Sequence, residues 1–173
     1  FPFCHDFALT KNYAVFFIGS IVFKNMMKVV SGWKSIADQV TYDSKISMKV
    51  LCVSLEDLTI KKEFELDHGA IVHFGNAFEE NNEIIVDAMY QDNFTANETL
   101  IDVFNPEGRF GGGIYKRYAL SLVTGQAKEE IISDNESEFP TFNNKLTGSR
   151  HQCTYTACSI DNGANGFFNA FQK

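Results

Sequence analysis

The sequence is poor in positive charge and has no long apolar run. Its 15 Lys and Arg residues are outnumbered by 22 Asp and Glu, which gives a net charge of −7. The basic residues are scattered, whereas nucleic-acid-binding proteins cluster them against phosphates, so we expect no nucleic-acid partner. No apolar run reaches the roughly 18 residues of a transmembrane helix. Peripheral contact with a membrane surface stays open.

Cysteine and histidine are also scarce, with four residues of each type. No two cysteines are spaced as Cys-x-x-Cys, which argues against a zinc ribbon. We interpret the thiols as free and the chain as intracellular. The four cysteines are Cys4, Cys52, Cys153 and Cys158.

Apolar and aromatic residues are plentiful: the chain is 45% hydrophobic and has 17 Phe. Phenylalanine has no polar group, so these residues suit a packed core or an apolar ligand tunnel. The length of 173 residues fits a single domain over 1–173. The chain starts with Phe1 rather than Met, and both ends lie beside apolar segments, which is unusual for natural domain ends. We therefore expect a partial domain, truncated at both ends.

Runs of β-branched and aromatic residues, separated by short turn sequences, extend along most of the chain. One run predicts a single strand over Asn12–Phe23. Others predict hairpins, with a polar tip at Glu79–Asn82 and turns at Thr124-Gly125 and Asp161-Asn162-Gly163. The hairpins pair Ile46–Val53 with Thr59–Phe64, Ala70–Phe74 with Glu83–Ala88, Tyr115–Val123 with Ala127–Ile132, and Gln152–Ser159 with Gly166–Phe171. This pattern predicts an all-β sandwich, barrel or propeller, and periodicity does not choose among them.

Only two stretches suggest a helix, Lys28–Gln39 and Asn97–Phe104. The first places four apolar residues on one face, namely Val29, Trp33, Ile36 and Ala37. The glycines Gly111–Gly113 lack the Gly-Lys-Ser/Thr of a phosphate loop and precede no helix, so we interpret them as a flexible turn or bulge.

Two histidines, His5 and His73, each lie at the edge of a strongly β-forming run, and the second is followed by the acids Glu79 and Glu80. Neutral imidazole binds iron, copper, nickel and zinc, and strands hold such ligands rigidly. The alternative is that each is a hydrogen-bonded core or loop histidine. Spacing alone favours that alternative.

Glu138 is the third candidate, because it leads into a rigid apolar turn. Pro140 is expected to restrict Phe139 to extended geometry. A carboxylate leading into a strand can reach inward and orient a metal-binding histidine through its second ring nitrogen. The alternative is a solvated loop acid, one of the acidic run Asp134, Glu136 and Glu138, and the residues alone favour it.

Several short motifs follow one another along the chain. From His5 to Phe16 the chain reads His-Asp-Phe-x-x-Thr-x-x-Tyr-x-x-Phe, and from His73 it reads His-Phe-Gly-Asn-Ala-Phe-Glu-Glu. Three further motifs are Glu83-Ile-Ile-Val-Asp87, Glu138-Phe-Pro-x-x-Asn143 and Gly148-Ser-Arg-His151, and Phe168-Asn-Ala170 resembles a closing segment. Together they resemble the carotenoid cleavage oxygenases, a family that includes the retinal pigment epithelium isomerase, plant carotenoid dioxygenases and bacterial lignostilbene dioxygenases.

The resemblance implies a seven-bladed β-propeller with a helical cap, of which this chain would form about three blades. In the family, four histidines bind Fe(II) and glutamates hold three of them. His5 and His73 match two of the four ligands, and Glu138 matches one of the glutamates. The other two ligands should lie outside this chain. His68 lies in a variable turn and His151 matches a position that binds no metal, so we exclude both.

The implied function is oxidative cleavage of a carbon–carbon double bond in a carotenoid, apocarotenoid or stilbene by an iron dioxygenase that uses O2. The apolar polyene or stilbene would be the substrate, and the cytoplasm or a plastid the location. One alternative is a non-catalytic propeller segment that binds an apolar ligand or a partner. Another is a secreted β-rich glycoprotein, suggested by sequons at Asn93, Asn97 and Asn135 and by the four cysteines, which a Cys153–Cys158 bridge would support.

Overall fold

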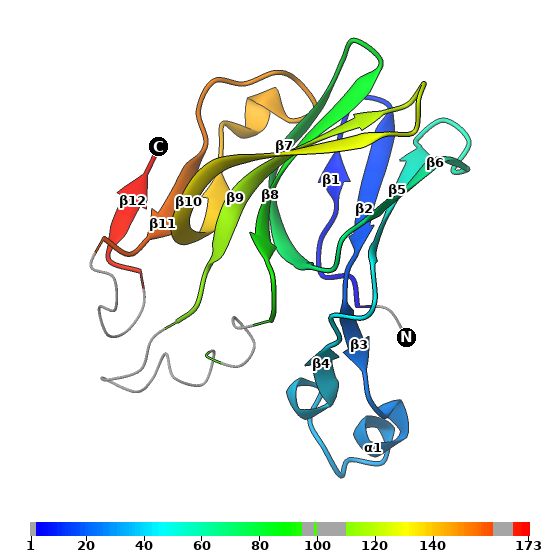
Figure 1. Ribbon diagram of the computed structural model, residues 1–173, viewed down its shortest axis with the longest axis vertical. Helices are drawn as coiled ribbons and strands as arrows, with labels where there is room; N and C mark the ends of the chain where they lie inside the picture. The colour runs from blue at the N-terminus through cyan, green and yellow to red at the C-terminus, as the bar shows by residue number, and fades with distance from the viewer. Residues whose placement is uncertain (1–2, 95–98, 100–109, 161–167) are drawn as a thin grey trace.

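The computed structural model describes residues 3–94, 99, 110–160 and 168–173. These residues form mostly β-strands, in a four-stranded, a six-stranded and a two-stranded sheet (Figure 1). The all-β prediction is therefore confirmed. Among the described residues, no helix is long and apolar enough to span a membrane.

The four-stranded sheet has the order β1-β2-β5-β6, and all neighbours are antiparallel. Its strands are β1 (Ala8–Leu9), β2 (Tyr13–Ile18), β5 (Met48–Ser54) and β6 (Ile60–Leu66). Met48, Val50 and Cys52 are buried on one face of β5, because successive side chains of a strand point to opposite sides. The predicted hairpin in this part of the chain is confirmed as β5–β6.

The six-stranded sheet has the order β12-β11-β10-β9-β8-β7 and is antiparallel throughout. Its strands are β7 (Ala70–Glu80), β8 (Glu83–Gln91), β9 (Gly113–Ser121), β10 (Ala127–Thr141), β11 (Tyr155–Cys158) and β12 (Ala170–Gln172). The predicted hairpins of this region are confirmed, although β7 and β10 extend much further than predicted. The predicted helix Asn97–Phe104 and the predicted turn Asp161-Asn162-Gly163 fall outside the fully described residues.

The turn between β7 and β8 is tighter than the predicted polar tip. It consists of Asn81 and Asn82, whose φ angles are 52° and 63°. Two left-handed residues fit the two-residue hairpin turn that matches strand twist, and Asn tolerates that conformation better than most residues. Glu79 and Glu80 are therefore part of β7 and pair with Ile84 and Glu83.

The predicted strand Asn12–Phe23 is interrupted. β2 ends at Ile18, and β3 (Ile21–Phe23) belongs to the two-stranded sheet. A Cβ on Gly19 would lie 2.4 Å from the carbonyl oxygen of Gly69, so the crossing requires glycine. Ser20 then donates to the Ile46 carbonyl at 2.6 Å and accepts from the Gly69 amide at 2.9 Å.

Residues 21–42 form a projection that we call the lobe, seen at the bottom of Figure 1. β3 pairs with β4 (Val40–Tyr42), and between them lie α1 (Met26–Val30) and a 3-10 turn, Ala37–Gln39. The predicted helix Lys28–Gln39 is therefore wrong as one element. α1 ends at Val30, where Ser31 is the C-cap and Gly32 follows with a φ of 75°, and the helix has no buried residue.

The main core lies between the two larger sheets. Val15 and Phe17 of β2 pack there with Phe74, Val86 and Tyr118 of the six-stranded sheet. A smaller cluster joins the lobe to β7 through Ile21, Val40, Ala70 and Phe94. The two clusters fix the base of the lobe and the start of β7.

The glycines at the start of β9 are packed closely rather than forming a flexible turn, and the register shift between Ser133 and Ser137, opposite Gly113, fits the alternative of a bulge. A Cβ on Gly112 would lie 2.8 Å from the Ser137 backbone, and one on Gly113 would lie 2.7 Å from the Tyr90 carbonyl oxygen. Their small size lets β8, β9 and β10 approach one another.

Candidate metal centre

His5 lies just before β1, in an extended segment beside β7. Its Nδ1 is 3.2 Å from the carbonyl oxygen of Val72, the residue before His73. A carbonyl oxygen only accepts hydrogen bonds, so Nδ1 carries the proton in this contact and Nε2 keeps a free lone pair. The imidazole is exposed.

His73, on β7, contacts Glu138, on β10. Its Nδ1 donates to Oε2 of Glu138 at 2.8 Å, across 65 residues of sequence. The side chain of His73 is 31% exposed, whereas that of Glu138 is only 2% exposed. The hydrogen bond to Glu138 raises the pKa of His73, against the opposing effect of burial. The interpretation of Glu138 as a solvated loop acid is therefore wrong.

Glu138 is held by its own neighbours. Its Oε2 also accepts from the backbone amide of Phe139 at 2.9 Å, and its Oε1 lies 3.5 Å from Nε2 of the buried Gln91. Phe139 has a φ of 56°, so the expected extended geometry before Pro140 is wrong. A left-handed conformation in a non-glycine residue is strained, and such strain is frequent at functional sites.

The two imidazoles lie next to each other. Their ring centroids are 5.2 Å apart, with an angle of 84° between the planes. Each ring has its Nδ1 engaged, by the Val72 carbonyl and by Glu138, which leaves both Nε2 atoms available as ligands. This donor set suits a first-row transition metal. Within the described residues no group of three or more His, Cys, Asp or Glu side chains could hold a metal ion.

Aromatic rings surround the two histidines. Phe3 stacks on His5 with centroids 6.3 Å apart, and Phe139 lies 5.3 Å from His73. Phe110 and Phe168 extend the second group, each within 6.4 Å of Phe139. The surroundings of the imidazoles are therefore apolar on two sides.

The two excluded histidines lie elsewhere. His68 Nδ1 is 2.5 Å from the hydroxyl of Tyr42. His151 Nε2 is 2.8 Å from Oγ1 of Thr154 and 3.9 Å from Oδ2 of Asp87, and burial lowers the pKa of this histidine. Neither is in a ring contact with His5 or His73 among the described residues.

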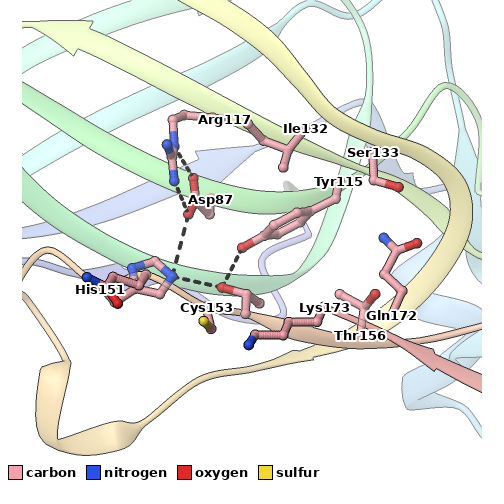
Figure 2. A pocket seen from close by; sticks show the side chains of 12 residues that line it. Asp87, Tyr115, Arg117, Ile132, Ser133, His151, Cys153, Thr156, Gln172 and Lys173 are labelled. Atoms are coloured by element: carbon pink, nitrogen blue, oxygen red, sulfur yellow. Dashed lines mark hydrogen bonds and ion pairs between the residues drawn. The ribbon is translucent and has the colours of Figure 1, made fainter.

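His151 instead lines a polar cavity of about 570 Å³ that neither His5 nor His73 lines (Figure 2). Arg117 donates from Nε and Nη2 to the two oxygens of the buried Asp87, at 2.7 and 2.9 Å. Tyr115 donates to Oγ1 of Thr154 at 3.0 Å. These contacts join β8, β9 and the loop before β11.

An all-β fold with two adjacent imidazoles from different segments, one of them backed by a buried carboxylate, is typical of histidine metal sites in β-proteins. The sequence matches the model of the family described as Retinal pigment epithelial membrane protein (RPE65) over residues 1–173. The chain belongs to this family.

Two curated relatives illustrate the match. Carotenoid 9,10(9′,10′)-cleavage dioxygenase 1 of Phaseolus vulgaris is 27% identical over 151 residues, which are 87% of this chain and 27% of that protein. Apocarotenoid-15,15′-oxygenase of Synechocystis is 22% identical over 174 residues, which are 100% of this chain and 35% of that protein. The chain thus spans about a third or less of their length.

Solved structures show the same fold. A crystal structure of an ACO/RPE65 chimera superposes with a TM-score of 0.80 at 22% identity, covering 99% of this chain and 36% of the other. Cobalt-substituted Synechocystis ACO gives 0.80 at 21% identity, with the same coverage. The propeller-type fold predicted from the resemblance is therefore confirmed.

The structure also identifies residues that sequence reasoning missed. Asn76 is buried, and its Nδ2 donates to the carbonyls of Leu146 and Ser149 at 3.0 and 2.7 Å, while its Oδ1 accepts from the Gly148 amide. Glu79 accepts three hydrogen bonds from the turn after β1. The only sequence signal for both was their fixed spacing from His73, at positions +3 and +6.

Proposed function

We propose that this chain forms part of a non-haem Fe(II) dioxygenase that cleaves a carbon–carbon double bond of a carotenoid or apocarotenoid with O2. The observation that carries the proposal is the pairing of His5 with His73, each with Nδ1 engaged, in the fold of a family whose curated members include carotenoid and apocarotenoid oxygenases.

His5 and His73 would hold the iron through their Nε2 atoms, and further ligands would come from outside the described residues. Bound Fe(II) would supply the reaction with O2 that organic side chains cannot perform. Glu138 keeps the proton of His73 on Nδ1 and fixes the plane of the ring, because its carboxylate is itself held by Phe139 and Gln91.

In this proposal the phenylalanines at the site bind the apolar substrate. Phe110, Phe139 and Phe168 present apolar rings beside His73, with centroids 5.5 to 6.4 Å apart. Such a wall binds an extended polyene through dispersion and apolar burial and keeps water away from the reacting bond.

The test is a product analysis with the full-length protein. It would be purified without air, supplied with Fe(II), and incubated with apocarotenals, carotenoids and stilbenes. Aldehyde products from a polyene, absent with the His73→Ala variant, support the proposal. Cleavage of stilbenes alone would show that the substrate is a stilbene and not a carotenoid or apocarotenoid. Binding of a polyene without turnover or iron would favour the alternative, a non-catalytic propeller segment that holds an apolar ligand.

We further propose that the lobe contacts an anionic membrane surface. Its apolar side chains point into solvent: Trp33 is 83% exposed and Val30 75% exposed, with Met27 and Ile36 also exposed. Lys24, Lys28 and Lys34 flank them, although the whole chain has a net charge of −7. Exposed apolar residues flanked by lysines bind interfaces that carry anionic lipids.

Vesicle sedimentation tests the membrane contact. The full-length protein should bind vesicles containing phosphatidylserine, and Trp33→Ser with Val30→Ser should release it. The control is Leu58→Ser, which also changes an exposed apolar residue, in the β5–β6 turn. Equal binding of both variants would contradict the proposal. The cytoplasmic or plastid location stays a prediction.

A further inference from the structure

The segment that carries His5 contacts β7 at two places, while its strand β1 pairs with β2. We call residues 5–12 the His5 segment. At one end, His5 Nδ1 contacts the carbonyl of Val72, 67 residues away. At the other end, the Asn12 amide donates to Oε1 of Glu79, again 67 residues away, at 2.9 Å. Two contacts with the same offset place the segment against the strand that carries His73 (Figure 1).

The contact at Glu79 is the stronger of the two. Besides the Asn12 amide, its carboxylate accepts from the Thr10 hydroxyl at 2.7 Å and from Nδ2 of Asn12 at 2.9 Å. The Thr10 side chain is also tied to its own turn, because its hydroxyl accepts from the Tyr13 amide at 2.9 Å. These hydrogen bonds lower the pKa of Glu79, against the opposing effect of burial. An ionised carboxylate with three donors makes strong, directional contacts.

The contact at His5 is weak by comparison. It is a single hydrogen bond of 3.2 Å on an exposed side chain. Between the two ends, Gly148 makes backbone bridges to both Thr10 and Phe78. Gly148 has a φ of 76°, and a Cβ there would lie 3.2 Å from the Lys11 amide nitrogen. The segment is thus packed closely at the Glu79 end and loosely at the histidine end.

We propose that Glu79 is a positioning residue for the metal centre: by fixing the Thr10–Asn12 turn on β7, it holds the segment where His5 lies beside His73. The inference rests on the proposed function, because it gives that placement a purpose. A segment released from Glu79 would be free to shift along β7 and carry His5 away from His73, which would separate the two Nε2 donors.

The experiment compares neighbouring acids of one strand. Glu79→Gln keeps the size of the side chain but points an amide N–H₂ group at donors. Glu80→Gln is the matched control, because the Glu80 carboxylate accepts from the exposed Arg150, in a different segment from the Thr10–Asn12 turn. Full-length protein would be titrated with Co(II) and followed by its visible absorption. We expect roughly tenfold weaker binding and an altered spectrum for Glu79→Gln, the usual size of effect for residues behind metal ligands. Glu80→Gln should match wild type.

Thr10 gives a second pair of variants if Glu79→Gln folds poorly. Thr10→Ser keeps the hydroxyl and should preserve Co(II) affinity, whereas Thr10→Val removes it and should weaken binding in the same direction as Glu79→Gln. An unchanged Co(II) affinity and spectrum in Glu79→Gln and Thr10→Val would overturn the proposal, even if both variants melt at a lower temperature. That result would give Glu79 a purely structural role.

Hydrogen exchange in the metal-free protein separates this proposal from the proposed function. If wild-type protein binds no Co(II), the metal assignment fails. Hydrogen exchange still reports how firmly residues 5–12 are held on β7. Faster exchange of the amides of residues 5–12 in Glu79→Gln, but not in Glu80→Gln, supports the positioning role. Equal exchange in both variants would overturn it.

Discussion

The histidine junction and the lobe are built in opposite ways. We define the junction as the His5 segment, β7 and Glu138. In the junction, polar side chains such as Glu79 and Asn76 make several short hydrogen bonds each, and Glu138 is buried. In the lobe, large apolar side chains such as Trp33 lie in solvent and α1 buries none of its residues.

The difference shows which part of the protein depends on a single arrangement of its side chains. Buried hydrogen-bonded polar groups fix a single arrangement, since any shift leaves a partner unsatisfied. Exposed apolar groups add nothing to the stability of the isolated fold and are found where another surface is met. The junction is therefore expected to be sensitive to small changes, and the outer part of the lobe insensitive.

On the side of the junction, the largest effect should come from the sheet that supports it. Asp87 is 1% exposed and makes two hydrogen bonds to Arg117. Asp87→Ala removes both hydrogen bonds from the half-buried guanidinium and should reduce the free energy of unfolding by roughly 1.5–3 kcal/mol. Urea denaturation measures it. Glu80→Ala, which removes the partner of the exposed Arg150, should cost about 1 kcal/mol or less. Equal losses would contradict the comparison.

A smaller effect is expected from the strained backbone at Phe139. Phe139→Ala and Phe139→Gly both remove the ring, but only glycine adopts a φ of 56° without strain. The glycine variant should therefore be more stable than the alanine variant by about 1 kcal/mol. Thermal unfolding of the metal-free proteins checks the order. Greater stability of the alanine variant would show that this conformation is not strained.

The hydrogen bonds that Glu79 accepts should make the free energy of unfolding depend on pH. The pKa of Glu79 is lowered in the fold from an ordinary value of 4.5. Its contribution is therefore present above that value and is lost as the pH falls through the lowered pKa. Between pH 5 and pH 3, wild-type protein should lose more stability than Glu79→Gln. Denaturant titrations across this range measure the difference, and parallel curves would contradict it.

The smallest effect is expected in the outer lobe. Trp33→Ser should change the free energy of unfolding by only about 0.5 kcal/mol, because the ring is 83% exposed. Ile21→Ala, at the buried base of the lobe, should cost roughly 2–4 kcal/mol. If both substitutions destabilised the protein equally, the outer lobe would be packed against the fold and its exposure would need another explanation.

Sequence reasoning predicted the junction better than the lobe. Alternating β-forming runs predicted most strands, because a half-buried strand leaves a period of two. The resemblance to the family singled out His5, His73 and Glu138, which the structure brings together. The burial of Glu138 could not be read locally, since it depends on β7, which is 65 residues away.

The errors have local physical causes. The helix Lys28–Gln39 was predicted from an apolar face that has nothing to pack against, and Gly32 ends α1 early. The break at Gly19 depends on contact with Gly69, which no periodic pattern records. Phe139 is left-handed although Pro140 follows it: its amide donates to the side chain of the preceding Glu138, and its ring packs beside the distant His73.

Iron analysis of the full-length protein is the most direct test of the central claim. The protein would be purified without air alongside His73→Ala, with His68→Ala as the control, because His68 bonds to Tyr42 away from the pair. We predict about one iron per chain in wild type and His68→Ala, and almost none in His73→Ala. Full iron occupancy in a correctly folded His73→Ala variant would contradict the assignment of this histidine as a ligand.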